Sequence, residues 1–422
     1  MKALATNITP EIKKERTPRS AAERIFYKYL ARANRGSLEI QFPSSGEFRT
    51  LGQRSDSAPI MQILDERFFW KVLRFGEVGF GEAYVDGLWT TDDLAGVLSW
   101  FLANNSVTPT FSANRGKSWF VNVLGIVNRA RHALRRNTRA RSKKNISEHY
   151  DLSNEFFSLL LDKSMTYSCA MFTKELSLHQ AQLRKFEVIC QKLGLKEGMR
   201  VLEIGCGWGG FAVHAATHFG VHMDCITISR EQHDWVKKLI SERGLEDRIT
   251  VRMLDYRDLT GQYDRVVSIE MVEALGYEFL DQFFQKAASA LAPDGLMLIQ
   301  AITFPDPYYE PYLQQTDWTQ KYIFPGSCLL SLRETLNAIH RTSDLVLWDV
   351  ESLGPNYAET LRQWRKNLHT NRSAIEKLGY DERFFRKWNY YLVFCEVGFE
   401  ARYINVQQWL FGRPMAQSLR SI

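Results

Sequence analysis

The sequence predicts an α/β fold, with a doubly wound sheet in its C-terminal part and a smaller α+β domain before it. Its 422 residues are enough for two domains with separate cores. From residue 200 onward, strand-like and helix-like segments alternate, as they do in doubly wound sheets. The first of these strands runs directly into a glycine-rich turn, where such folds bind their ligands.

The sequence of the N-terminal part predicts a polar tail followed by a short domain. Residues 1–19 are polar and charged, and they predict a disordered tail that lacks the apolar stretch of a secretory signal. Residues 20–33 fit a helix, and the alternating residues 37–50 fit a β-hairpin around a Ser-Ser-Gly turn. Residues 65–101 fit helices that glycines interrupt. The interruptions are expected at Gly79, Gly81 and Gly87.

The N-terminal domain is expected over residues 20–114, a linker over 115–147 and the C-terminal domain over 148–422. In the last domain, strands are expected at residues 201–204, 222–227, 249–253, 265–269, 296–301, 345–351 and 405–411. Helices are expected at residues 230–243, 279–291, 358–377 and 382–400. Residues 293–295, Pro-Asp-Gly, predict a turn. Residues 303–336 are aromatic and irregular, and an insertion of this length fits a cover over a substrate.

The composition limits the class of protein. Hydrophobic residues make up 45% of the chain and aromatic residues 13%, which indicates a globular protein. No apolar run approaches the roughly 18 residues that a membrane span needs. The six cysteines lack C-x-x-C spacing, so we predict no metal site, no disulfide framework and a reducing compartment. The chain is therefore expected in the cytoplasm.

Basic residues gather in the predicted linker, where apolar residues are mixed with them and acidic residues are absent. The ten basic residues are Arg115, Lys117, Arg129, Arg131, Arg135, Arg136, Arg139, Arg141, Lys143 and Lys144. This mixture favours peripheral contact with an anionic phospholipid bilayer at the inner face of the membrane. A solvated linker helix is the alternative. Nucleic-acid binding is a weaker one, because no recognised nucleic-acid motif accompanies the run. A homodimer remains a hypothesis.

The glycine-rich turn is the segment MRVLEIGCGWGGF at residues 199–211. Its glycines allow a sharp strand-to-helix turn and a close approach of backbone to a ligand. Their spacing differs from the G-x-G-x-x-G of dinucleotide sites. The acid before them, Glu203, suits a ligand with an ammonium group and hydroxyls, such as S-adenosylmethionine. The alternative is a glycine turn of an unrelated α/β domain.

Further motifs follow one another in a fixed order. They are HYDLSNEFF at 149–157, MTYSCA at 165–170, IEMVEALG at 269–276 and YIFPG at 322–326. With the glycine turn, they resemble the cyclopropane fatty acid synthase family, which includes the mycolic acid methyltransferases. The segment GFGEAYVDGLW at 79–89 is similar to the N-terminal domain of longer members. The resemblance implies a class I S-adenosylmethionine-dependent methyltransferase domain.

The expected cofactor residues come partly from the glycine turn and partly from this resemblance. Backbone at Gly205, Gly207 and Gly209 would approach the methionine part of the cofactor, with Glu203 near its amino group. The resemblance implies that Thr227, Ser229 and Gln232 hold the ribose. It also implies that Asp255 and Tyr256 contact the adenine and that Tyr167 and Ser168 close over the cofactor. The alternative for each is a buried polar residue that bonds to nearby backbone.

The implied reaction is methyl transfer to a cis double bond in a phospholipid acyl chain, followed by closure of a cyclopropane ring. The intermediate carbocation needs a dry site and aromatic faces. The aromatic candidates are Tyr308, Tyr309, Tyr312, Trp318, Tyr322 and Phe324. The resemblance implies a bound bicarbonate ion as the base that removes the proton. Its implied ligands are Cys169, Glu273, the backbone of Ile302, Tyr357 and Gln300.

Departures from the family pattern leave the product open. Gln300 stands where a histidine is usual, and a glutamine cannot shuttle a proton. Ala274, Ser327 and Leu330 also depart from the usual motifs. A methyl- or methylene-branched, or otherwise modified, fatty acid is therefore the first alternative product. A small-molecule or nucleic-acid methyltransferase is the second alternative function, and a non-catalytic lipid-surface protein is the third.

Overall fold

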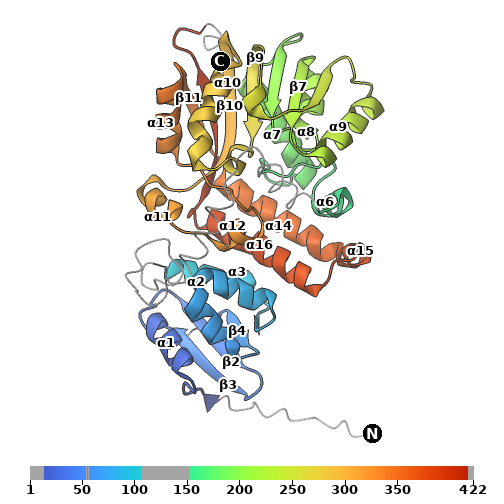
Figure 1. Cartoon of the computed structure of the whole chain (residues 1–422). Coiled ribbons are helices and arrows are strands. Elements are labelled where there is room, and N and C mark those ends of the chain that lie inside the picture. Colours follow the sequence, from blue (N-terminus) through green and yellow to red (C-terminus); the bar gives the residue numbers. More distant parts are fainter. Residues whose placement is uncertain (1–13, 54, 56, 106–151, 417–422) are drawn as a thin grey trace. The chain divides into compact units, whose positions relative to one another are not determined.

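A computed structural model describes residues 14–53, 55, 57–105 and 152–416 (Figure 1). The chain divides into two compact units, residues 1–124 and 125–422, and each unit is described by itself. The dividing point falls within the segment predicted as a linker. The basic segment 115–144 lies outside the described residues, so its predicted contact with a bilayer remains a prediction. None of the described helices is long and apolar enough to cross a membrane.

The N-terminal unit packs helices against a sheet with the strand order β1-β3-β2-β4-β5 among its described residues. The strands are β1 (Lys14–Glu15), β2 (Ser37–Phe42), β3 (Glu47–Gly52), β4 (Ile60–Ile63) and β5 (Trp89–Thr90). The helices are α1 (Ala21–Leu30), α2 (Arg67–Val85) and α3 (Leu94–Ala103). The predicted hairpin is confirmed as β2 and β3, and the first predicted helix is confirmed as α1, capped by the Ser20 side chain.

Two predictions for this unit are wrong in part. Residues 14–19 do not belong to a disordered tail, because β1 pairs with β3 and the side chain of Arg16 is buried among carboxylates. Gly79 and Gly81 do not interrupt a helix, because both lie inside α2. The bend in α2 is at Gly76, where φ is 56°. An interior glycine costs only about 1 kcal/mol, so the burial of its neighbours decides whether the helix continues.

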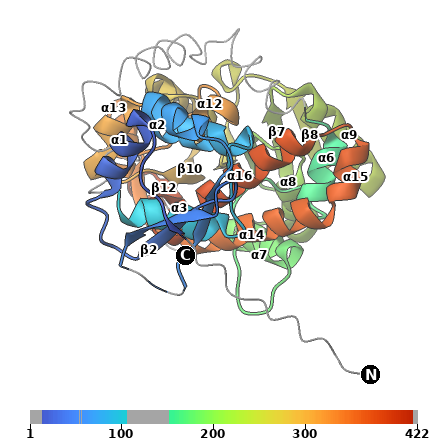
Figure 2. The same ribbon diagram turned by 90° about the horizontal axis from the view of Figure 1, so that it is seen from below.

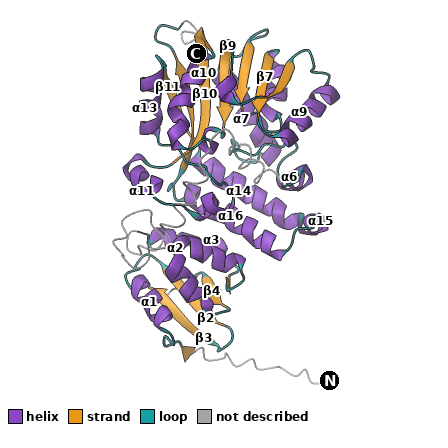
Figure 3. Ribbon diagram, viewed as in Figure 1, coloured by secondary structure: helices purple, strands orange, loops and turns teal. Residues whose placement is uncertain are grey.

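The second unit holds a sheet with the order β11-β12-β10-β9-β6-β7-β8, seven strands in the part of the chain that is described (Figure 3). The strands are β6 (Arg200–Ile204), β7 (His222–Thr227), β8 (Ile249–Met253), β9 (Tyr263–Ile269), β10 (Leu291–Thr303), β11 (Val346–Ser352) and β12 (Asn405–Gly412). The strands from β10 to β8 are parallel, and β12 runs antiparallel to both of its neighbours. The predicted doubly wound α/β fold is confirmed.

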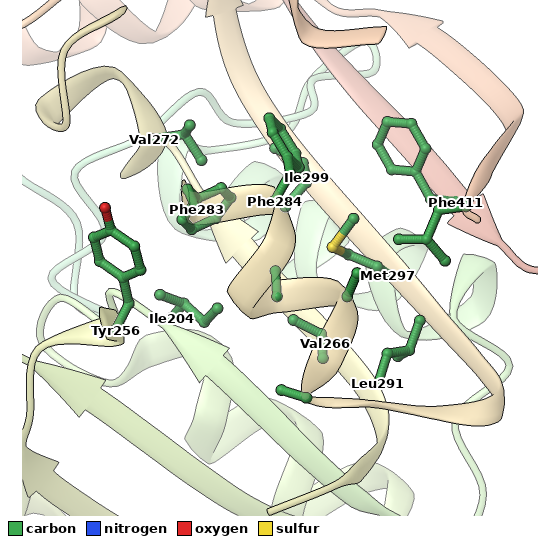
Figure 4. Packing of buried hydrophobic residues seen from close by; sticks show 14 of the residues in the cluster. Ile204, Tyr256, Val266, Val272, Phe283, Phe284, Leu291, Met297, Ile299 and Phe411 are labelled. Carbon is green, nitrogen blue, oxygen red and sulfur yellow. The ribbon is translucent and has the colours of Figure 1, made fainter. Parts of the chain in front are cut away.

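Helices cover both faces of this sheet and bury side chains that alternate along its strands. They include α7 (Leu178–Lys192), α8 (Gly210–Phe219), α9 (Arg230–Arg243), α10 (Leu280–Ser289) and α13 (Leu332–Thr342). Along β10, Met297 and Ile299 join the core with Phe283 and Phe284 of α10 (Figure 4). Leu296 and Leu298, which alternate with them in sequence, join the core on the other face. This period of two explains why β10 reads as a continuous apolar run.

Further helices pack together in the same unit: α6 (Asn154–Leu160), α14 (Gly354–Thr370), α15 (Arg372–Lys377) and α16 (Glu382–Glu400). α14 and α16 lie side by side (Figure 2). The single helix predicted over 358–377 is thus two, α14 and α15. The turn predicted at 293–295 is a shift in register inside β10. The irregular insertion contains the short helices α11 (Tyr309–Leu313) and α12 (Trp318–Tyr322), and α13 begins within it.

Candidate active site

A cavity of about 170 Å³ lies among the segments that follow β6, β7, β8 and β9. Ligands bind at these carboxyl ends in doubly wound folds. Of the predicted cofactor residues, it is lined by Tyr167, Ser168, Glu203, Gly205, Gly207, Thr227, Gln232, Asp255 and Tyr256. Gly209 and Ser229 do not line it; they are the N-cap residues of α8 and α9 respectively. The fold therefore brings together most of a set that is dispersed over 90 residues of sequence.

The glycine turn has the backbone conformation that its residue types predict. Gly205, Gly207 and Gly209 have φ values of +83°, +52° and +84°, in the left-handed region that favours glycine. A Cβ at Gly205 would lie 2.4 Å from the Cγ of Met271. A Cβ at Gly207 would meet no protein atom within 4 Å, and Gly207 lines the cavity. The open space at Gly207 is therefore part of the cavity, and packing of the protein does not require a glycine there.

Polar side chains surround the opposite end of the cavity. The hydroxyl of Thr227 donates to Gln232 Oε1 at 2.9 Å, and the backbone N–H of Gln232 donates to Ser229 Oγ. Asp255 accepts hydrogen bonds from the backbone and the guanidinium of Arg257. The hydroxyl of Tyr256 is buried and has no hydrogen-bond partner in the described part of the chain. The side chains of Thr227, Gln232 and Asp255, which line the cavity, offer polar groups to a ligand with hydroxyls or amines.

The predicted base ligands converge on Glu270, a residue that sequence reasoning missed. One carboxylate oxygen accepts from the backbone N–H of Cys169 at 2.8 Å and from Gln300 Nε2 at 2.7 Å. The other accepts from the hydroxyl of Tyr357 at 2.6 Å. Glu270 itself lines the cavity. Its position directly after β9 was the available signal, because functional groups gather at the carboxyl ends of parallel strands.

Glu273 has a different environment. One of its oxygens accepts from the backbone N–H of Ile302 at 2.5 Å, and the other is buried without a partner among the described residues. Burial, and then the charge of Glu270, raises the pKa of Glu273 to about 8. The structure thus separates the predicted ligand set: Ile302 contacts Glu273, and the three other groups contact Glu270.

The thiol of Cys169 is a buried donor. It lies 3.2 Å from the carbonyl oxygen of Ala170, and burial raises its pKa well above the usual range of a thiol. A thiol that keeps its proton is not a nucleophile. Cys169 therefore contributes its backbone N–H to Glu270, and its side chain packs in the core.

A buried lysine, also missed, lies beside the site. Lys185 donates to Ser168 Oγ at 2.6 Å, and burial lowers its pKa to about 8 although nearby carboxylates, Glu270 first among them, oppose that shift. Burial raises the pKa of Glu203 to about 8. The signal for Lys185 in the sequence was weak, because a lysine in an amphipathic helix normally lies on the solvated face.

The aromatic residues near the cavity are not those that were predicted. Tyr167, which lines the cavity, packs against Trp364 and Phe324 with ring centroids at 5.1 and 6.5 Å. None of the six predicted rings is among the described residues that line the cavity, although Phe324 contacts Tyr167 in a ring pair. Tyr309 and Tyr312 instead form a separate buried cluster with Phe304 and Cys328, and Tyr308 is exposed. The aromatic content predicted that aromatic rings lie beside the substrate, but only the packing shows which rings these are.

The buried acids of this site predict how stability depends on pH. Glu203 has its folded pKa raised from 4.5 to about 8, so between these values the folded chain holds a proton that the unfolded chain releases. We expect the ligand-free chain to lose stability as pH rises from about 4.5 to 8, by a few kcal/mol at most. Thermal unfolding at several pH values measures this. Glu203→Gln should make the slope smaller, leaving the part due to Glu273, and the exposed control Glu197→Gln should not. Equal slopes for the two variants would contradict the assignment.

Known proteins resemble the whole chain. The family described as mycolic acid cyclopropane synthetase matches residues 137–409. The tuberculostearic acid methyltransferase UfaA1 of Mycobacterium tuberculosis is 35% identical over 404 residues, covering 93% of this chain and 92% of that protein. The cyclopropane-fatty-acyl-phospholipid synthase of Escherichia coli K12 is 37% identical over 369 residues, covering 86% and 91%.

Solved structures also resemble this chain. The mycolic acid cyclopropane synthase CmaA1, complexed with SAH and CTAB, is 32% identical with a TM-score of 0.60. That match covers 64% of this chain and 97% of CmaA1. SAH is the product that S-adenosylmethionine becomes on losing its methyl group, so its presence there agrees with the ligand expected in this cavity.

Proposed function

The chain belongs to the mycolic acid cyclopropane synthetase family and is an S-adenosylmethionine-dependent methyltransferase, and from this we propose that it methylates the cis double bond of unsaturated phospholipid acyl chains. We propose a cyclopropane ring as the product. The observation that carries the proposal is a single cavity lined both by the glycine turn and by Glu270, on which the residues expected to serve the base converge.

The substrate class is supported by which relatives share the N-terminal unit. The E. coli synthase, whose name specifies fatty acyl phospholipid, matches 86% of this chain. The methoxy mycolic acid synthase MmaA3 of M. tuberculosis matches only 65% of this chain but 97% of its own length. The N-terminal unit thus accompanies the phospholipid enzyme and the tuberculostearic acid methyltransferase UfaA1, which covers 93% of this chain, and not the mycolic acid enzyme. A phospholipid substrate is the simplest explanation of that difference.

The residues present fit the cofactor and the reaction. S-adenosylmethionine supplies an electrophilic methyl group when it is bound. The glycine turn leaves space for its methionine part, and Gln232 and Asp255 on the cavity wall offer polar contacts. The ring of Tyr167, which lines the cavity and packs on Trp364, can stabilise a carbocation without reacting with it. Burial of the rings also keeps water, which would add to the cation, away from it.

Bicarbonate does not fit the same residues. Three of its expected donors, the N–H of Cys169, Gln300 Nε2 and the Tyr357 hydroxyl, already donate to Glu270. The backbone N–H of Ile302 donates to Glu273. A bicarbonate ion in this place would have to displace a carboxylate and would lie against its negative charge. No step is therefore assigned to bicarbonate.

Incubation with labelled S-adenosylmethionine and vesicles of monounsaturated phospholipid tests the proposed function. The expected result is a fatty acid heavier by one CH₂ with the ring protons of a cyclopropane in its NMR spectrum. Vinyl protons of a methylene group, or a methyl doublet, would show that the product is branched and has no cyclopropane ring. Methylation of small amines or nucleic acid alone, without lipid labelling, would contradict the substrate class.

We also propose that the basic segment holds the enzyme at anionic phospholipid. Changing Arg135, Arg136, Arg139 and Arg141 together to glutamine should weaken vesicle binding by about 1 kcal/mol per charge, and less at high salt. Sedimentation with anionic vesicles measures the change. The control changes the exposed Lys174, Lys196, Lys238 and Lys377 to glutamine. Equal binding of both variants to the vesicles would show that the segment acts only as a linker.

A further inference from the structure

Glu270 is held in a conformation that its residue type disfavours. Its φ is +51°, in the left-handed region that glycine occupies without strain. Non-glycine residues there cost of the order of 1 kcal/mol or more, and they persist where the surrounding structure demands them. A glycine would satisfy the backbone at this turn, so the demand comes from the side chain.

The contacts of Glu270 form a complete anion site that the protein fills itself. Three donors from separate parts of the chain meet its carboxylate: the turn before α7, strand β10 and helix α14. Gln408 on β12 donates to the Oε1 of Gln300, and this bond orients the amide so that its Nε2 faces Glu270. Three directed donors favour the ionised carboxylate.

These donors are the ones that the family resemblance assigns to bicarbonate. A glutamate carboxylate and a bicarbonate ion share a planar anionic group of one carbon and two acceptor oxygens. The side chain of Glu270 thus presents from within the protein the group that an exchangeable ion would bring. Because Glu270 also lines the cavity, the same carboxylate faces the space where substrate would lie.

We propose that Glu270 is the base of the reaction and takes the place of an external bicarbonate ion. The inference rests on the proposed function and specifies its base. The π electrons of the alkene form the new C–C bond, the C–S electrons stay on sulfur, and the neighbouring carbon becomes a cation. An oxygen of Glu270 then removes one proton from the new methyl group, and the electron pair of that C–H bond closes the ring. The proton passes to solvent after product release.

The groups around Glu270 suit this role. The amino group of Lys185 donates to Ser168, and its charge favours ionised Glu270. Tyr357 on α14 and Gln300 on β10 donate hydrogen bonds to the Glu270 carboxylate. Glu273 is the other carboxyl near Glu270, and burial, followed by the charge of Glu270, raises its pKa to about 8. Burial raises the pKa of Glu270 as well, but the Tyr357 hydroxyl, the charge of Lys185, the Gln300 amide and the Cys169 N–H oppose that shift and favour the ionised carboxylate.

Two variants test the base. Glu270→Gln keeps the size of the side chain but cannot take the proton, and kcat should fall by about 10² to 10⁴. Its affinity for S-adenosylhomocysteine, measured by calorimetry, should be close to that of the parent chain. Glu270→Gly suits the positive φ and leaves the three donors to an added anion. It should be as slow as Glu270→Gln in carbonate-free buffer and recover activity when sodium bicarbonate is added.

Binding of ¹³C-bicarbonate, followed by NMR, supplies a readout that needs no turnover. The Glu270→Gly variant should bind the ion saturably and the parent chain should not. Glu175→Gly is the matched control, because Glu175 also has a positive φ of 72° but is exposed and does not line the cavity. This control should behave as the parent chain in every assay.

Either of two results would overturn the inference. One is a parent chain that binds bicarbonate saturably, or loses its activity when carbonate is removed and regains it on return. The other is a Glu270→Gln variant with nearly full kcat. Failure of the proposed function is distinct: the parent chain would then methylate no unsaturated phospholipid, while the bicarbonate-binding measurement would still decide what Glu270 replaces.

Discussion

Replacing Arg16 with methionine is expected to lower the free energy of unfolding of the N-terminal unit by about 3–5 kcal/mol. The Arg16 side chain is 1% exposed, and its guanidinium pairs with Glu23, Glu47 and Glu66 at 2.7, 3.1 and 2.5 Å. Its guanidinium carbon also lies 3.7 Å from the ring centroid of Phe42. Methionine keeps the packing but leaves the fully buried Glu23 without its cation.

Calorimetric unfolding of the full chain, with hydrogen exchange to identify the first unit, measures this loss. Arg19→Met is the matched control, since Arg19 also pairs with Glu47 but is 54% exposed, and exposed pairs contribute about 0–1 kcal/mol. The double variant Arg16→Met with Glu23→Met should recover much of the loss, because no unpaired charge then remains buried. Equal effects of Arg16→Met and Arg19→Met would show that burial of the pair does not matter.

Replacing Gly207 with valine is expected to abolish binding of S-adenosylmethionine. Gly207 has a φ of +52°, lines the cavity, and has no protein atom within 4 Å of where a Cβ would lie. A β-branched side chain would project into this free space and would strain the backbone. Both effects remove the close approach of backbone that the glycine turn provides.

The matched control is Gly194→Val. Gly194 has a φ of +56° and equally open surroundings, but it does not line the cavity. Both variants carry the same backbone strain, so the difference between their affinities for S-adenosylmethionine, measured by calorimetry, reports the cavity alone. Gly194→Val should bind as the parent chain does. Normal affinity for S-adenosylmethionine in a folded Gly207→Val variant would show that the glycine turn does not bind the cofactor.

The cofactor half of the site was predictable because its residues are contiguous with strand ends. Gly205 and Gly207 directly follow β6, Thr227 ends β7, and Asp255 follows β8 closely. Parallel strands bring their carboxyl ends to one edge of the sheet, so these side chains meet once the strands are recognised. Two residues that were assigned to the cofactor, Gly209 and Ser229, do not line the cavity. Each is instead the N-cap of a helix.

The base was not predictable in the same way. Glu270 and Glu273 lie three residues apart, and both follow β9, so spacing alone does not rank them. What separates them is the position of groups from distant segments. The Tyr357 hydroxyl and Gln300 amide reach Glu270, whereas the backbone of Ile302 reaches Glu273. A resemblance at the level of motifs assigned all of these groups to a single ion.

The sequence by itself determined the doubly wound sheet, the glycine turn with its cofactor, and the family, because each depends on periodicity or on contiguous motifs. Only the tertiary structure decided that Arg16 belongs to a folded unit, which rings border the cavity, and which carboxylate receives the donors. These features depend on contacts between residues far apart in the chain. Their energies arise from burial and from the mutual distance of charges, and neither quantity exists until the chain has folded.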